Sequence, residues 1–417
     1  MTATAVRSNR ITTRTPQARA ETSATGKANP IAHLTPEQIE AIGRELDELR
    51  DEILGSRGAA DAAYIRKVIR TQRILEAGSR IVLLFSKFPP AFIAGTTGLT
   101  VAKIIENTEI GHNILHGQWD WMRDKKIHSS TWEWDFASPA EQWKRSHNVE
   151  HHTYTNVVGM DNDLGYNIMR VDPDQEWEFK HLLQPVTNFF TMLFFEYGIA
   201  AYDMQIKEWK EGKRPHDEFM ADLKNMLTKL SKQVTKDYVV HPLLSGRSAL
   251  TTLAANAIAN TLRNVWTHSV ILCGHLPEGV ETFETESIEG ETRGEWYLRQ
   301  MLGSANITGS KLMHLMSGNL SHQVEHHLFP DMPSNRYAEI APRIREIMER
   351  HGLKYVSGPL HQQVASAWRK VFRYSLPNKR PGKSRLREVA TAAREAVGDV
   401  VRNTRGMWRP RPAAVAS

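Results

Sequence analysis

Apolar residues recur at helical spacing along most of the chain, and this pattern predicts an all-α protein. A first helix begins after Thr35, where Pro36 and Gln38 complete a helix-start signal. Apolar residues then repeat from Ile39 to Ile53 with charged residues between them, as in an amphipathic helix. The same period returns between Tyr337 and Arg350, which predicts a second amphipathic helix near the end of the chain.

Three further segments are mostly apolar but are interrupted by charges. Residues 74–102 contain a Pro89-Pro90 pair, and because proline breaks a helix we expect two helical segments there. Residues 182–202 and 249–273 each carry at least one internal charge. None of the three is an uncharged run of 18 residues, the usual signal of a membrane-spanning helix. Hydropathy alone therefore leaves membrane insertion undecided.

The composition limits the chemistry that the chain can carry out alone. The 417 residues are 41% hydrophobic with a mean hydropathy of −0.45, which is polar for a membrane protein. The net charge of +6 favours anionic partners such as phospholipid head groups, nucleic acid or the phosphates of coenzyme A. Cys273 is the single cysteine, which excludes a disulfide framework and an iron–sulfur cluster. Any electrons must therefore come from another protein.

The two ends of the chain differ in composition from its middle. Residues 1–30 are rich in Thr, Ala and Arg and are predicted to form a disordered basic arm. Residues 377–417 form a predicted basic tail, whose charge suits anionic lipid on the cytoplasmic leaflet and places both termini inside. The predicted folded domain is 31–376.

Histidines gather in three short clusters that are far apart in the sequence. Imidazole is the commonest transition-metal ligand near neutral pH, and residues four apart share one face of a helix. Each cluster can therefore direct a pair at one metal, and the adjacent His-His pairs can reach a second one. So many imidazoles exceed one tetrahedral zinc site and suit two first-row metals in one cavity. The pairs are His112 with His116, His147 with His151, and His322 with His326, and the extra members are His152 and His327.

These motifs resemble the three histidine boxes of membrane fatty acid desaturases. They read HNILH, HNVEHH and SGNLSHQVEHHLFPDMPSNRY. The third box has the form QxxHH and is followed by LFP. In this it is similar to the third box of acyl-lipid, front-end and acyl-CoA desaturases, including actinobacterial ones. The resemblance covers roughly Tyr64 to Leu376. It implies an integral-membrane fold with about four spanning helices and a cytosolic helical cap that holds a dimetal site.

The resemblance also implies a ligand set. Gln323 stands where other members carry a histidine, so it is expected to act through water or by hydrogen bonding, and His322 competes for that role. One more ligand is expected from the helix between boxes two and three, where His275 is favoured over His268. The implied metal ligands are His112, His116, His147, His151, His152, His275, Gln323, His326 and His327.

Two neighbouring motifs have weaker functional interpretations. Asp161-Asn162-Asp163 follows the second box and is expected to orient ligand histidines, although such clusters are more often simple turns. Trp132 and Trp134 are candidates for the wall of an acyl channel, although aromatic residues at this density are more often core.

The resemblance implies an enzyme with two irons that inserts a cis double bond into a long-chain acyl-CoA or acyl-lipid, using dioxygen and two electrons. The chain has no His-Pro-Gly-Gly haem motif, so a separate ferredoxin or flavoprotein reductase is the expected electron donor. The expected location is the cell membrane, multi-pass, with the active site and both termini on the cytoplasmic side. Nucleic acid is not an expected partner.

Three alternatives remain open at this point. Histidine-rich diiron hydroxylases and monooxygenases share such a scaffold. A soluble ferritin-like desaturase uses ExxH pairs, and Glu109 with His112 and Glu178 with His181 have that spacing. A metal carrier or sensor would need no apolar tunnel.

Overall fold

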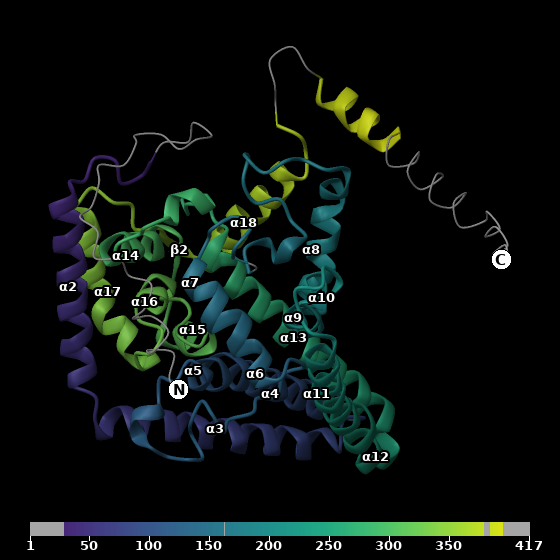
Figure 1. Cartoon of the computed structure of the whole chain (residues 1–417). Coiled ribbons are helices and arrows are strands. Elements are labelled where there is room, and N and C mark those ends of the chain that lie inside the picture. The colour runs from purple at the N-terminus through teal and green to yellow at the C-terminus, as the bar shows by residue number, and fades with distance from the viewer. Residues whose placement is uncertain (1–28, 162, 379–383, 395–417) are drawn as a thin grey trace, which may run out of the picture.

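The computed structural model describes residues 29–161, 163–378 and 384–394, and most of these residues are helical (Figure 1). The all-α prediction is confirmed. The described residues include a short parallel sheet of β1 (Asn306–Thr308) and β2 (Ser357–Pro359), in which Asn306 pairs with Ser357. Of the predicted arm 1–30 only residues 29–30 are described, and of the predicted tail 377–417 the structure describes 377–378 and 384–394.

The first predicted helix is α2 (Pro36–Gly55), and Thr35 and Gln38 form its capping box as expected. Its apolar face packs against α14 (Arg293–Leu302), α16 (Gln323–Leu328) and α17 (Tyr337–Arg350) in one hydrophobic core. In Figure 1 α2 and α17 lie side by side along one edge of the molecule. The apolar face of α2 consists of Ile39, Ile42, Leu46, Leu49 and Ile53.

A helical hairpin forms the base of the molecule. It consists of α3 (Ala59–Leu83) and α4 (Pro89–Ile105), and the proline pair begins α4 as the sequence predicted. The two helices pack closely, since a Cβ on Gly98 would lie 2.3 Å from the Ser79 Oγ. The long helix α13 (Ala249–His275) packs against this hairpin through Ala255 and Ala259.

Shorter helices flank α13 on the side away from α2 (Figure 1). They are α8 (Gln184–Leu193), α9 (Phe195–Asp203), α10 (Ile206–Lys210), α11 (His216–Val234), the π-helix η6 (Thr235–Val240) and α12 (His241–Leu244). The remaining helices include α15 (Lys311–Met316), α18 (Leu360–Tyr374) and 3₁₀ turns η2 (Asp120–Met122), η4 (Gly165–Asn167), η5 (Phe179–Leu183), η7 (Gly246–Ser248), η8 (Thr285–Ile288) and η9 (Ser334–Arg336). Within the described residues, no helix combines the length and the hydrophobicity that crossing a membrane requires.

Candidate metal centre

One π-helical segment ends at the first histidine box, and another carries most of the second. Helix α4 runs directly into the π-helix η1 (Glu106–His112), followed by α5 (Asn113–Leu115). The second box starts at α6 (Ala140–Trp143), continues as the π-helix η3 (Lys144–His151) and ends in α7 (His152–Tyr154). The third box is α16. π-Helical turns are rare and are frequent at functional sites. The simple α-helical geometry expected from the sequence therefore does not hold for box two. Box one keeps it, since the His116 N–H donates to the His112 carbonyl at 3.1 Å, one α-helical turn away.

The boxes bring seven imidazoles together in two neighbouring groups. Within each group, one ligand atom from every residue lies within 4.8 Å of the others. The groups touch, since the ring centroids of His152 and His326 are 4.8 Å apart. The first group is His112, His116, His147 and His326, and the second is His151, His152 and His327.

His275 and Gln323 lie beside the second group. The His275 Nε2 is 3.2 Å from the His327 Nε2 and 3.0 Å from the Gln323 Nε2. Gly274 makes room for this arrangement, because a Cβ there would lie 2.9 Å from the Gln323 Cδ. All nine residues of the implied ligand set therefore face one buried region.

The structure places His268 and His322 outside this region. The His268 ring contacts Phe195, and its Nε2 bonds the Asn188 Oδ1 at 3.1 Å. His322 stacks on His314 with ring centroids 4.6 Å apart. The expectation that His322 and His326 share one helical face is wrong, because His322 precedes α16 with non-helical dihedrals (φ −104°, ψ 57°).

His147 and His151 also depart from the simple pairing. They were expected to point at one metal. The structure places them in different imidazole groups, although they also form a third possible metal group together with Asp163. They remain close, with stacked rings 5.0 Å apart, and Asp163 lies within reach of both. The second box therefore serves both groups, whereas His112 and His116 of the first box stay together.

Hydrogen bonds to Nδ1 fix the orientation of most of these rings. Asp163 Oδ2 lies 2.9 Å from the His147 Nδ1, and Asp161 Oδ1 lies 2.9 Å from the His151 Nδ1. Such partners hold the tautomer and leave Nε2 for a metal. The other Nδ1 contacts are His112 to Asn113 (3.0 Å), His326 to Tyr337 (3.2 Å), His327 to Gln300 (3.1 Å) and His275 to the Gly303 carbonyl (3.3 Å).

Several buried nitrogens in the cluster have no hydrogen-bond partner among the residues that the structure describes. The Nε2 atoms of His116, His147, His152 and His326 are all of this kind. Unpaired buried polar atoms are costly and rare, so their convergence fits metal ions that accept their lone pairs. The histidine clusters are therefore able to hold metal.

Burial also keeps most of these imidazoles neutral. It lowers the pKa of His147, His152, His326 and His327 well below the usual range, and the neighbouring histidines reinforce the effect. Burial would lower the pKa of His151 too, but the carboxylates of Asp161 and Asp163 outweigh it and raise that pKa. Neutral imidazole is the metal-binding form.

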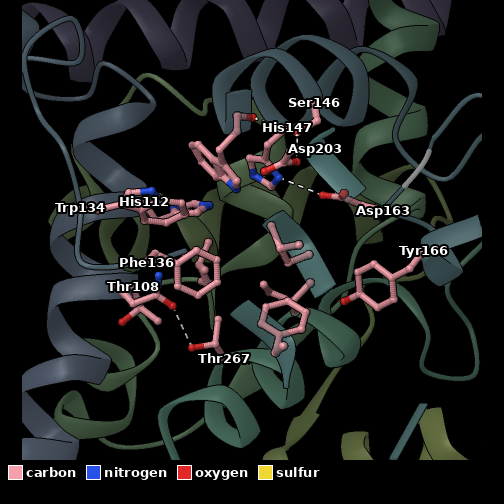
Figure 2. Close-up of a pocket in the computed structure, with 16 residues that line it drawn as sticks. Thr108, His112, Trp134, Phe136, Ser146, His147, Asp163, Tyr166, Asp203 and Thr267 are labelled. Carbon is pink, nitrogen blue, oxygen red and sulfur yellow. Dashed lines mark hydrogen bonds and ion pairs between the residues drawn. The ribbon is translucent and has the colours of Figure 1, made fainter. Parts of the chain in front are cut away.

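An apolar cavity adjoins His112 and His147 (Figure 2). About 510 Å³ of empty space, part of it open to solvent, lies between its lining atoms. Trp134 lines it, as the sequence suggested, whereas Trp132 does not. In Figure 2 Asp203, Asp163 and His147 lie at one side of this space and Thr108 and Thr267 at another. Its apolar wall consists of Trp134, Phe136, Trp143, Phe195, Ile199, Ile271 and Leu320.

The chain matches the family model "Fatty acid desaturase" over residues 87–359. It belongs to the fatty acid desaturase family. Across 353 residues, 84% of this chain and 83% of the relative, it is 46% identical to an "NADPH-dependent stearoyl-CoA 9-desaturase" of Mycobacterium tuberculosis. It is 25% identical to an "sn-1 linoleoyl-lipid 6-desaturase" of Synechocystis over 289 residues, 67% of this chain and 79% of the relative. No solved structure matches it significantly.

This desaturase is therefore an enzyme, an oxidoreductase of fatty acyl chains. The glutamates of the ferritin-like alternative have other partners. Glu178 caps η5 together with His181, far in sequence from the boxes. Glu109 accepts hydrogen bonds from Tyr64, Asn319 and Ser334 at 2.6–2.8 Å.

Sequence reasoning missed several residues that support the desaturase's histidines. The Gln300 side chain contacts the His327 Nδ1 and donates to the His152 carbonyl at 3.3 Å, so it links boxes two and three. Gln118 donates to the Tyr337 hydroxyl at 3.0 Å, behind His326. Neither glutamine belongs to a histidine motif, so no signal in a single sequence identifies it.

Proposed function

We propose that this desaturase is a membrane-bound diiron enzyme that inserts a cis double bond into a long-chain acyl-CoA. The observation that carries the proposal is the pair of buried imidazole groups beside an apolar cavity. The Mycobacterium relative is named for stearoyl-CoA and for position 9, which supports this substrate and this bond here. An acyl-lipid is the second carrier class, supported by the more distant lipid desaturases.

The reaction removes two hydrogens from adjacent methylenes. One O₂, two electrons and two protons then yield two waters and the alkene. Two irons, held by the histidine groups with His275 and Gln323 beside them, would supply the O₂-dependent oxidising power that no side chain has. The electrons come from a separate donor, which the name of the relative links to NADPH.

Side chains of the protein hold the imidazole rings in position and shield the alkyl chain from water. Asp161, Asp163 and Gln300 fix the imidazole rings from behind. The apolar cavity binds the alkyl chain against His112 and His147 and excludes water from it. Trp143 stacks on His147 with ring centroids 4.4 Å apart and fixes the wall where the chain passes the metal centre.

The proposed location is the cell membrane, multi-pass, with the metal centre and both termini on the cytoplasmic side. Large apolar side chains are exposed on the α3–α4 turn, α8, α12 and α13, and a bilayer would cover them. Two charges of α4 and α13 are buried and paired inside the molecule, since Lys103 pairs with Asp237 at 2.7 Å and Arg263 pairs with Glu196. Charges within membrane proteins typically lie inside and pair in this way. The exposed apolar set includes Phe85, Phe88, Phe189, Phe190, Leu243, Leu244 and Leu250.

Expression in a bacterial host followed by mass spectrometry of its fatty acids tests the activity. The wild type should produce a new monounsaturated acid, and His151→Ala or His327→Ala should abolish it. His361→Ala, an exposed histidine outside the cluster, is the matched control and should keep full activity. Retained activity in both cluster variants, or hydroxy fatty acids instead of alkenes, would contradict the proposal.

Fractionation of the same cells tests the location. The desaturase should stay in the membrane pellet after an alkaline carbonate wash and should be released by detergent. Recovery of active enzyme in the supernatant without detergent would refute membrane insertion.

A further inference from the structure

Seven exposed cations lie on α3 and on a loop that packs against it, and we call them the basic surface. Four lie on α3 between Arg66 and Arg73, and three lie in the loop that follows the first histidine box. Arg66 joins the two parts through an ion pair with Asp124 at 3.2 Å. The basic surface consists of Arg66, Lys67, Arg70, Arg73, Arg123, Lys125 and Lys126.

Most of this positive charge is unbalanced. Asp124 neutralises Arg66, and the buried Glu106 pairs with Arg73 at 2.9 Å. The other five cations form no ion pair with any residue that the structure describes. An exposed face with such an excess attracts anionic partners and steers their approach.

The basic surface is built onto the elements that hold the metal centre. Its loop begins at Gly117, directly after His116, and the Ser129 carbonyl accepts a hydrogen bond from Lys144 at the start of η3. Ile127 of the loop packs in one core cluster with Ile65 of α3. A partner bound here would therefore lie over the segments that carry boxes one and two.

A lipid surface fits only part of this face. The exposed apolar residues of α3 begin at Ile74 and continue through Ile81 toward Phe88. The loop cations join α3 at Arg66, eight residues before Ile74, or about 12 Å at 1.5 Å per residue. A bilayer that covers Ile74 and the residues beyond it leaves Lys125 and Lys126 in water, free for a soluble partner.

We propose that the basic surface docks an acidic, soluble electron-transfer protein. The proposal rests on the desaturase reaction proposed above, which consumes two electrons. The chain cannot hold an iron–sulfur cluster of its own, because Cys273 is its single cysteine. Docking beside the first two boxes would bring the donor close to the metal centre, where electron transfer is fastest.

The test measures binding of a plant-type [2Fe–2S] ferredoxin, an acidic protein, to the full-length enzyme in phosphatidylcholine nanodiscs. In about 50 mM NaCl, the Lys125→Glu/Lys126→Glu variant should bind with a Kd about tenfold higher than wild type. The difference should shrink in about 300 mM NaCl, because salt screens exposed charges. The control is Lys207→Glu/Lys210→Glu, the same charge change on exposed lysines of α10, and its Kd should equal that of wild type.

A second measurement separates docking from chemistry. Single turnover of stearoyl-CoA after chemical reduction with dithionite should be equal in all three proteins, because it bypasses the donor. Failure of this turnover in the wild type counts against the proposed function, whereas the Kd values still report docking. Equal Kd values in all three proteins would overturn the docking proposal. The docking proposal would also be overturned if Lys125→Glu/Lys126→Glu bound ferredoxin normally and lost binding only to membranes that contain phosphatidylglycerol.

Discussion

Asp161 and Asp163 are two residues apart, yet each makes its shortest contact with a histidine of a different imidazole group, and Asp163 also lies 3.9 Å from His151. Asp163 contacts His147 of the first group and Asp161 contacts His151 of the second, both at 2.9 Å. A carboxylate behind an imidazole makes it a stronger ligand and fixes its ring. One short turn therefore supports both metal positions.

This arrangement predicts that the two aspartates act on different metals. Asp163→Asn should weaken iron binding at the His147 group, and Asp161→Asn at the His151 group, each by about 10–100-fold. Iron analysis during titration with a chelator should then show one iron lost before the other in each variant. Asp51→Asn, at an exposed aspartate, should behave like wild type. Two irons of unchanged affinity in both variants would contradict this division.

Among individual residues, the sequence predicts the metal ligands better than it predicts the residues that hydrogen-bond to those ligands. Spacing and repetition identified the histidines, because three clusters with the same pattern are improbable by chance. Gln300 and Tyr337 are single residues of ordinary type, and only the folded chain brings them to His327 and His326.

Gln300 lends itself to a direct test. Gln300→Met should lower the free energy of unfolding by about 1–3 kcal/mol, because buried polar groups at His327 and His152 lose their partner. Iron affinity should fall as well, which a purely structural residue far from the centre would not cause. Gln362→Met, at an exposed glutamine of α18, is the control. Unchanged iron affinity would show that Gln300 does not position His327.

Among the helices, the contact between α9 and α13 shows how polar residues hold apolar elements together. Arg263 and Glu196 are both fully buried and form an ion pair. Arg263 also donates to the Asp135 carbonyl at 3.1 Å and lies over the Phe136 ring. These charges lower the hydropathy of the two helices without exposing any polar surface.

Replacing one partner of this ion pair should destabilise the protein far more than replacing both partners. Arg263→Met should destabilise the protein by about 3–5 kcal/mol, since it leaves the Glu196 carboxylate buried and unpaired. The double change Arg263→Met/Glu196→Met should recover much of that loss. Unfolding in detergent measures both, with Arg247→Met at an exposed site as control. Additive losses in the double variant would refute the coupling.

Helices with a strong apolar period were predictable, and irregular segments were not. The amphipathic helices α2 and α17 and the break at Pro89 follow from local rules of spacing and capping. The π-helical turns η1 and η3 depend on tertiary contacts, so a local pattern could not distinguish them from α-helix. For the same reason the place of His322 was mispredicted.

For the whole molecule, the metal centre is where distant segments meet. Residues from η1, η3, α13 and α16 converge there, so bound metal would cross-link parts of the chain up to 215 positions apart (327 − 112). A ligand that binds the folded state only stabilises it by about 2.7 kcal/mol at 100 times its Kd.

Metal removal should therefore lower the Tm of the whole protein. Thermal unfolding of the chelated enzyme in detergent should occur several degrees below that of the iron-loaded form, and adding iron back should restore it. His361→Ala should show the same difference as wild type. A Tm that is independent of iron would mean that the imidazole groups are not a metal site.

The solitary thiol of Cys273 is fully buried in α13. Thiol reagents reach exposed cysteines selectively, so the native protein should remain unlabelled. A single cysteine placed on any outer helix would then carry a fluorophore or spin label without background. Orientation and distance measurements on the intact enzyme could start from the natural sequence, with no need to remove a native cysteine first.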